Sequence, residues 1–505
     1  MGQNLVDAAA PRVLHLSLIW SRRDARSARR LFRPTGPSAA RSGETLQLEN
    51  KAIQPQIDTG AESGPGPLRF RPRPSPFNYP LHVARILLLA ALFGAPLAFG
   101  AVIPTAWVAL GLVASVALFL WALGSVQQGQ IKLVWSPLYI PLALFFLLGA
   151  AQYAARLTLD TSETRQALVL LTTDLIFFFL AVQLFGGGRS STLQGFGMAV
   201  LIYAGCMGLF AILQSASGTL RIFGFVETGS SALFGPYVDR DHFAGLMEML
   251  LPVAIFYMAG RHGRLSLEGS VWRVSAVGLA LAALLLSGSR AGLLALAMEI
   301  AIATLVLRRA GLRTGQKRRL AIAAGLALAA GAILFAYVDP GWVAKKLGSV
   351  ARVDKTWDEW AGERQKMASD ALHMWREHPW LGVGLGDFET AYPRYQSFPT
   401  DMWIDHAHND YVEAAAETGV VGAVLILATV ALFLYLAFRN VSHLFGSNAG
   451  WVRLGAALGC CGLLVHSMAD FNLHIPANAA WFAVLAGIAT SEQSGAGVPP
   501  AVSHF

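Results

Sequence analysis

Charged side chains are scarce in this sequence. Asp, Glu, Lys and Arg make up 14% of its 505 residues, while hydrophobic residues make up 54%. Soluble domains carry roughly 25% charged residues, so this composition excludes an ordinary soluble protein. It predicts an integral membrane protein instead.

Cysteine is equally scarce. The three cysteines, Cys206, Cys460 and Cys461, all fall inside apolar segments. Their spacing matches neither a disulfide framework nor a zinc site, so cysteine leaves the redox compartment of the protein open.

Long apolar runs, by contrast, recur along the chain. A helix that rises about 1.5 Å per residue needs roughly 20 apolar residues to cross about 30 Å of hydrocarbon. The fold class that we predict is therefore an all-α integral membrane protein with about twelve transmembrane helices. These are expected at Leu81–Ala101, Thr105–Gly124, Leu138–Ala154, Ala167–Phe185, Phe196–Leu213, His242–Gly260, Val271–Leu286, Ala291–Leu307, Leu320–Val338, Gly419–Phe438, Trp451–Met468 and Ala477–Thr490.

This pattern divides the chain into five parts. Residues 1–80 are rich in Arg, Pro and Ser and are predicted to form a disordered, basic cytoplasmic tail. Transmembrane helices 1–9 follow over residues 81–338, and helices 10–12 cover 419–490. Between them lies a long, partly helical periplasmic loop, residues 339–418, in which a capping box at Thr356–Glu359 predicts an amphipathic helix that ends near Glu377. Residues 491–505 are expected to be a second disordered tail.

The orientation of the helices follows from the basic loops. Residues Arg308–Arg319 contain six basic residues and no acid, and Arg261–Arg264 is also basic. Because Lys and Arg accumulate on the cytoplasmic side, both loops are placed inside. Four segments then face outward: GPYVDRDHFAG (Gly235–Gly245), SGSRAG (Ser287–Gly292), the long loop, and ADFNLHIPANA (Ala469–Ala479).

Two arginines on this outer face are candidate anion ligands. Arg240 and His242 flank Asp241, the expected N-cap of a helix, where backbone N–H groups and the positive helix end attract anions. The alternative is that Asp239 and Asp241 neutralise Arg240. Arg290 lies in a turn at the edge of the hydrocarbon, where a ligand phosphate or a lipid phosphate would hold it.

Carboxyl groups occur inside some of the predicted spans, Glu248 and Glu299 among them. Glu248 and Glu299 are costly to bury, and the sequence names no partner for either. For Glu299 we favour a protonated or hydrogen-bonded structural role over a proton relay.

The segment DHAHNDYVE, Asp405–Glu413, is the densest in titratable groups. His406, His408 and Asp410 match the H-x-H-x-D pattern of metallo-hydrolases, but Tyr411 stands where another ligand is needed, so no metal is expected. Asp410 and Glu413 fit a capping box instead, which places His408 just ahead of a helix N-terminus. That environment favours a neutral imidazole, the state of a general base, although a merely structural histidine is the alternative.

The combination of these motifs resembles the O-antigen ligase and polymerase superfamily. The motifs are GPYVDRDHFAG, LSGSRAG, HPWLGVGLGDFETAYPRY, HAHNDYVEAAAETG and DFNLHIPAN. The resemblance implies metal-independent glycosyl transfer at the periplasmic face of a Gram-negative inner membrane, without a cofactor. The donor would be an undecaprenyl-pyrophosphate-linked glycan, and the acceptor a hydroxyl of lipid A core, of another glycan or of a protein.

The resemblance also implies roles for individual residues. Arg240 and Arg290 would hold the pyrophosphate and His408 would be the catalytic base, with His242, Asp410 and Tyr411 as supporting substrate-binding residues. Membrane lipids are expected partners and nucleic acid is not. The products would belong to lipopolysaccharide or exopolysaccharide biosynthesis.

Two other functions remain open on the sequence. A transporter or flippase of lipid-linked glycans would also place charge among many helices, but such proteins commonly carry internal repeats and binding sites near the bilayer midplane. No repeat is evident here, and the polar clusters lie at one surface. A non-catalytic polysaccharide assembly protein is the other alternative.

Overall fold

The computed structural model describes residues 14–16, 78–128, 131–186, 190–219, 221–227, 232–260, 267–310, 355–400, 403–439 and 441–491, with the single positions 314, 315, 317 and 325. All of these except Asn78 belong to one structural unit. The predicted ninth span, Leu320–Val338, apart from position 325, lies outside the described residues, as do most of the basic tail and residues 492–505.

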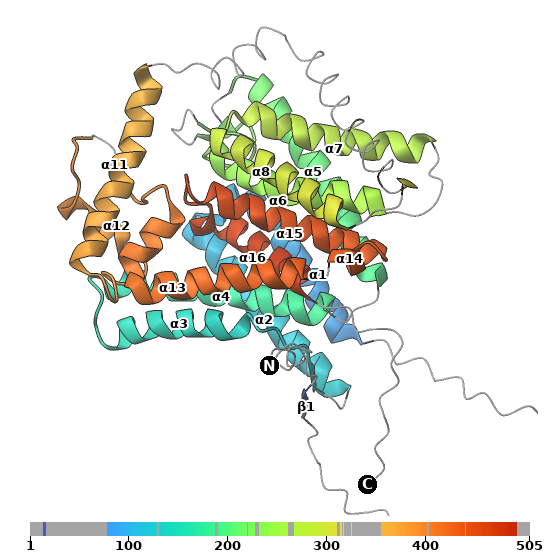
Figure 1. The fold of residues 1–505 in the computed structure, drawn as a ribbon, viewed down its shortest axis with the longest axis horizontal. Helices are drawn as coiled ribbons and strands as arrows, with labels where there is room; N and C mark the ends of the chain where they lie inside the picture. Colours follow the sequence, from blue (N-terminus) through green and yellow to red (C-terminus); the bar gives the residue numbers. More distant parts are fainter. Residues whose placement is uncertain are drawn as a thin grey trace, which may run out of the picture. The chain divides into compact units, whose positions relative to one another are not determined.

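Helices account for nearly all of the described structure (Figure 1). In chain order the elements are β1 Leu14–Leu16, α1 Tyr79–Gly94, η2 Ala95–Ala101, α2 Pro104–Gln127, β2 Ile131–Leu133, α3 Tyr139–Ala154, α4 Thr161–Phe185, α5 Ser190–Ala216, β3 Arg221–Ile222, β4 Val226–Glu227, α6 Arg240–Gly260, α7 Leu267–Ser287, α8 Arg290–Arg309, α11 Lys355–Glu377, α12 Phe388–Ala391, η3 Tyr392–Arg394, α13 Asp410–Phe438, α14 Val441–Leu444, α15 Asn448–His466, η4 Asn472–His474 and α16 Pro476–Thr490.

The strands are short. β1 pairs with β2 and β3 with β4, each pair antiparallel. β1 falls within the segment that the sequence predicts to be disordered.

The fold class is that of a multi-pass, all-α membrane protein. Among the described residues, nine helices are long and apolar enough to cross a bilayer. Two of the predicted spans, α3 and α16, are shorter apolar helices. With the ninth predicted span outside the described residues, these eleven helices correspond one to one to the remaining predictions, and their boundaries differ by up to nine residues.

Side-chain caps fix where several of these helices begin. Asp160 caps α4 by accepting from Ser162 N, and Ser289 caps α8 by accepting from Gly292 N. Asn409 caps α13, because its side-chain oxygen accepts from the backbone N–H groups of Tyr411 and Val412. Each cap satisfies donors that a helix end would otherwise leave without an acceptor.

The centre of the helix bundle is the pair α6 and α15. In the most apolar window of these helices, 89% and 94% of residues are buried, against 17% for α2 and for α13. Gly455 and Gly459 of α15 make the close contact possible, because a Cβ on either would lie 2.7 Å from a backbone atom of α6. This spacing of small residues is typical of tightly packed membrane helices.

The other helices pack around this pair. α5, α7 and α8 contact one another or the central pair, and α4 contacts α16 and α3. Figure 1 shows α7 and α13 on opposite sides of α15. Large apolar side chains such as Phe119 and Leu427 are exposed at 66% and 62%, as expected for lipid-facing positions.

The described part of the predicted loop has a core of its own. Met367, Ala371 and Met374 of α11 pack with Phe388 and Tyr392 of the following segment. α11 ends at Glu377, as the sequence predicts, and its apolar face contacts this core and the start of α13. α13 then runs on into the bundle with a kink at Gly419, whose φ is +66°.

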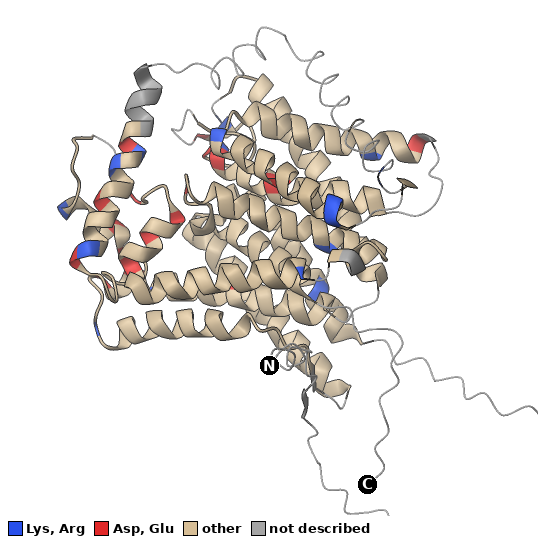
Figure 2. Cartoon of the chain, viewed as in Figure 1, with Lys and Arg blue, Asp and Glu red and all other residues tan. Residues whose placement is uncertain are grey.

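Charge is distributed unevenly along the helix axes. Figure 2 shows acidic side chains gathered on α11, on α12 and at the start of α13, and basic side chains of the bundle concentrated at the opposite end. Arg308 and Arg309 in the last turn of α8 and Arg439 at the end of α13 belong to that basic end. The candidate site lies at the acidic end.

Candidate functional site

Five helix termini meet at one end of the bundle. α6, α8, α13 and α16 begin there and α15 ends there, joined by residues 467–475 between α15 and α16. Asp410 N donates to Ser467 O at 3.0 Å, and Asn409 Nδ2 donates to Met468 O at 2.8 Å. These bonds tie the segment that carries His408 to the segment that carries Asp470.

His408 and Asp470 form the centre of the site. Nδ1 of His408 lies 3.0 Å from Oδ1 of Asp470, and the side chains are 19% and 1% exposed. His408 directly precedes the cap Asn409 and has a φ of +49°, a conformation that is uncommon for a residue with a side chain. The turn directs the imidazole back to Asp470, so one ring nitrogen is held by a buried carboxylate.

Asp470 is surrounded by cationic and basic groups. Nε2 of His242 lies 3.7 Å from its Oδ2, and NH2 of Arg364 lies 3.9 Å from its Oδ1. Burial alone would raise the pKa of Asp470, but the hydrogen bond from His408 and the charges of His242 and Arg364 hold that pKa well below its ordinary value. Asp470 is therefore a carboxylate.

Arg364 of α11 connects the loop core to the bundle. Its NH1 donates to Ala469 O at 2.7 Å, and its NH2 lies 3.2 Å from Oδ2 of Asp241. Neither Arg364 nor Asp470 was a candidate from the sequence. Asp470 lies in a motif that carried the family resemblance, whereas Arg364 stands in a polar helix where nothing marks it out.

The surroundings of Arg240 differ from the sequence expectation in one respect. Asp239, not Asp241, caps α6, because its Oδ1 accepts from Asp241 N at 2.7 Å. The helix begins two residues earlier than expected, at Arg240 instead of His242. In the described part of the chain, Asp241 pairs with Arg364 and neither acid makes an ion pair with Arg240, so the neutralisation considered from the sequence is not observed.

Arg290 is the first residue of α8, next to the cap Ser289. Gly292, two residues after Arg290, packs on α6, because a Cβ there would lie 2.9 Å from Ala244 and from Glu248. Gly292 thus permits the close packing of α8 against α6. The contact makes the first turns of α6 and α8 neighbours, so Arg240 and Arg290 lie at the same end of the bundle.

Beneath the site, Glu248 has a partner that the sequence did not reveal. Nδ1 of His466 lies 2.9 Å from its Oε1, and both side chains are 0% exposed. Nε2 of His466 lies 3.9 Å from Oδ2 of Asp470. Alternating imidazole and carboxylate groups thus form a chain of contacts from His408 through Asp470 and His466 to Glu248. Glu299, the second acid noted within the predicted spans, packs against Gly462 of α15.

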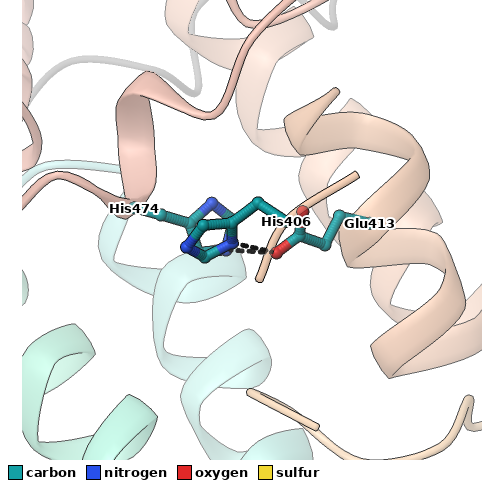
Figure 3. Close-up of side chains that lie close together, drawn as sticks. All are labelled: His406, Glu413 and His474. Atoms are coloured by element: carbon teal, nitrogen blue, oxygen red, sulfur yellow. Dashed lines mark hydrogen bonds and ion pairs between the residues drawn. The ribbon is translucent and has the colours of Figure 1, made fainter. Parts of the chain in front are cut away.

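A second polar cluster lies beside the first (Figure 3). Glu413 Oε1 lies 2.7 Å from Nδ1 of His406 and 3.4 Å from Nε2 of His474, and Oδ1 of Asp410 lies 2.8 Å from Nδ1 of His474. Burial would lower the pKa of His474, but the carboxylates of Glu413 and Asp410 raise it to about 10. Burial also lowers the pKa of His406, but the carboxylate of Glu413 has the larger effect, so the pKa of His406 is raised above its ordinary value.

Each residue of the H-x-H-x-D pattern thus has a different partner, although His406 and Asp410 both belong to the second cluster. His408 pairs with Asp470, His406 with Glu413, and Asp410 with His474 and with Leu473 N at 3.2 Å. The expected capping box also shifts: Asn409 is the cap, and Glu413 Oε2 accepts from Ala407 N at 2.7 Å.

Phe471 lies between the two clusters. Its ring stacks on His406 at 4.3 Å between centroids, and meets His242 and His408 in T-shaped contacts at 4.7 and 4.9 Å. The ring keeps the imidazoles of the two clusters at fixed positions relative to each other.

An apolar cavity of about 370 Å³ opens next to these groups. Its walls are formed by side chains of α3, α4, α13 and α16, and Asp410, Tyr411, Glu417 and His474 supply polar lining. Tyr411 donates its hydroxyl to Leu464 O at 2.8 Å. The cavity therefore combines a hydrocarbon interior with the polar cluster at the end of the bundle.

Comparison with known proteins adds one finding. A search of curated proteins gives no match. Residues 275–427 match the family model described as O-antigen ligase. The matched segment contains Arg290, Arg364 and His408, whereas Arg240 and Asp470 lie outside it. Together with the membrane-spanning helices, this match supports a ligase- or polymerase-type role in glycan transfer, and over residues 275–427 it supports the resemblance to the O-antigen ligase and polymerase superfamily.

Proposed function

We propose that this protein transfers a glycan from an undecaprenyl-pyrophosphate carrier to an acceptor hydroxyl, at the periplasmic face of a bacterial inner membrane. The observation that carries the proposal is the His408–Asp470 pair, a partly exposed imidazole held by a buried carboxylate. The family match supports the same class of reaction.

His408 is the general base of this reaction. With Nδ1–H donated to Asp470, Nε2 carries the lone pair that accepts the proton of the acceptor hydroxyl. The acceptor oxygen then bonds to the anomeric carbon as the bond from that carbon to the carrier phosphate breaks. The pyrophosphate leaves with the bonding electrons, and attack opposite the phosphate inverts the anomeric carbon.

Arg240 and Arg290 stabilise the leaving pyrophosphate. Guanidinium groups bind phosphate oxygens in a bidentate manner, and both arginines stand at helix N-termini, where the helix dipole also favours an anion. Fixed positive groups that face a developing negative charge lower the barrier to its formation. No divalent metal is needed at the pyrophosphate in this mechanism. His242 supports the site through its contact with Asp470.

The apolar cavity is suited to the carrier. Its hydrocarbon walls fit part of a polyprenyl chain, while Asp410 and Tyr411 at its lining stand where the head group of such a lipid would pass. The basic residues at the opposite end of the bundle favour the cytoplasm for that end, which supports a periplasmic site.

Transport of a lipid-linked glycan and a non-catalytic assembly role are the alternatives. A transporter would be expected to bind its substrate near the bilayer midplane. The arginines and the His408–Asp470 pair stand instead at helix ends, a position that favours transfer chemistry at the membrane surface.

Complementation of a deletion strain tests the proposal. The strain receives wild type, His408→Ala, Arg290→Ala or the control His378→Ala, an exposed histidine of the same loop, at matched expression. We expect both site variants to lose the glycan product and the control to retain it. Loss of glycan on lipid A core with long lipid-linked chains would identify a ligase, and loss of chain length or exopolysaccharide a polymerase. Full restoration by both site variants would refute the catalytic assignment and favour the alternatives.

A further inference from the structure

The cluster of His406, Glu413 and His474 has no part in the transfer proposed above. It lies across Phe471 from the His408–Asp470 pair and joins three segments: the loop before α13, the first turn of α13, and η4. Figure 3 shows both imidazoles directed at the carboxylate of Glu413.

We propose that His406, Glu413 and His474 bind one divalent transition-metal ion of the zinc class. One ligand atom from each residue lies within 4.8 Å of the others. Zinc bonds to nitrogen and oxygen are about 2.0–2.2 Å long, so the ligands of one ion stand roughly 3–4 Å apart. Small side-chain rotations are sufficient to open the 2.7 Å contact between His406 and Glu413 to that spacing.

The donor atoms select the class of metal. Two imidazole nitrogens and one carboxylate oxygen are the ligand set of many zinc sites and suit neither calcium nor magnesium, which prefer oxygen ligands only. His406 and His474 remain 24% and 33% exposed, which leaves access for water as a fourth ligand.

The groups around the cluster are those that a metal site needs. Oδ1 of Asp410 lies 2.8 Å from Nδ1 of His474 and fixes the tautomer in which Nε2 is directed at Glu413. Ala407 N donates to Oε2 of Glu413 at 2.7 Å and leaves Oε1 for the metal. Such outer partners orient ligands and raise their affinity for metal.

A bound metal ion would restrain the loop that carries His408. His406 and His408 are two residues apart, so binding at His406 restrains the backbone turn that directs His408 to Asp470. This consequence rests on the proposed function, whereas the metal site itself does not. The ion has a structural role and makes no contact with the pyrophosphate.

Metal content tests the site directly. The full-length protein is purified in detergent without chelator, stripped with a chelator, and titrated with Zn²⁺ and with Co²⁺ as a spectroscopic probe. We expect one ion per chain, and visible absorption bands of four-coordinate Co²⁺ with nitrogen and oxygen ligands. Absence of stoichiometric binding by the wild-type protein overturns the proposal, because the groups then hold protons in a simple ion-pair network.

Variants identify the ligands. Glu413→Gln keeps the shape and one acceptor oxygen but loses the anionic ligand, and His474→Ala removes one nitrogen; both should abolish stoichiometric binding. Asp410→Asn should weaken binding by roughly 10- to 100-fold. The control His378→Ala should bind like the wild type. Wild-type affinity in Glu413→Gln would overturn the assignment even if His474→Ala failed to fold.

His408→Ala separates this inference from the proposed function. This variant should lose glycan transfer while it binds Co²⁺ with the wild-type spectrum. Metal binding with unimpaired transfer in His408→Ala would refute the catalytic base and leave the metal site standing. If transfer depended on His408 but the protein bound no metal, the metal site would be refuted and the catalytic base would stand.

Discussion

Asp470 accepts a hydrogen bond from His408 at 3.0 Å although 62 residues separate them in the chain. Helices α13, α14 and α15 lie between the two residues, and the end of α15 must lie beside the start of α13 to bring them together. The pair places a buried acid behind an imidazole that is 19% exposed, the arrangement by which hydrolytic enzymes orient a histidine base.

Replacing Asp470 should disable the base without removing it. In Asp470→Asn the imidazole loses the carboxylate that orients Nδ1–H, and we expect transfer to fall by roughly 10²- to 10⁴-fold. The measurement is single-turnover transfer from a lipid-linked donor in nanodiscs. A rate equal to the wild type would exclude a positioning role for Asp470.

The pH profile of the same enzyme provides an independent check. The pKa of Asp470 is held well below its ordinary value by His408, His242 and Arg364, so the carboxylate stays charged as pH falls to about 4. Protonation of Asp470 should therefore cause no loss of wild-type activity above that pH. Asp470→Asn should be impaired at every pH from about 5 to 9. Recovery of the variant at one end of this range would contradict the assignment.

Arg364 should matter for stability as well as for the site. Arg364→Met removes the guanidinium that links Asp241, Asp470 and Ala469 O, and leaves buried acids with fewer partners. Loss of one partner from a buried ion pair costs roughly 3–5 kcal/mol. We expect a clear fall in the thermal unfolding midpoint in detergent.

The matched control for this change is Arg394→Met. Arg394 pairs with Glu377 at the surface, with side chains 77% and 54% exposed. Exposed pairs contribute about 0–1 kcal/mol, so the control should unfold close to the wild type. Equal effects of the two substitutions would show that Arg364 does not connect the loop to the bundle.

The packing of α6 against α15 predicts the effect of a single methyl group. A Cβ at Gly459 would lie 2.7 Å from the backbone oxygen of Met249, so Gly459→Ala forces the helices apart and should cost roughly 1–3 kcal/mol. Gly195 of α5 is an exposed helical glycine with no atom within 4 Å of an added Cβ. Gly195→Ala should therefore be neutral or stabilising by about 0.5–1 kcal/mol. A stable Gly459→Ala variant would argue against the close contact.

The sequence predicted the helices well because each transmembrane segment is encoded locally. An apolar run of sufficient length forms a helix in lipid whatever its neighbours are, since it must satisfy its own backbone hydrogen bonds. The end of α11 at Glu377 was also predictable locally, because His378 and Pro379 follow it and a residue before proline disfavours the helical conformation. Only the ends shifted, as at α6, where Asp239 is the cap in place of Asp241.

The partners of the site residues were less accessible to sequence reasoning. His466 lies inside an apolar run and pairs with Glu248, 218 residues earlier, so no local pattern shows the contact. The same holds for Arg364 and Asp241, which are 123 residues apart. The motif around His408 indicated chemistry, but its three residues separate onto three different partners because side chains two positions apart in an irregular segment need not face the same way.

Arg290 offers the sharpest test of how the leaving group is stabilised. Arg290→Ala removes the guanidinium at the start of α8 and should lower kcat/KM for the lipid-linked donor by roughly 10²- to 10³-fold. Arg290→Lys keeps the charge but loses the bidentate geometry, so its activity should fall between those of the wild type and the alanine variant. Arg308→Ala, in the last turn of the same helix, is the control and should leave the rate unchanged, because Arg308 belongs to the opposite, basic end of the bundle. If Arg290→Ala and Arg308→Ala had the same kinetics, lipid phosphates and not the substrate would be what holds Arg290 at the membrane edge.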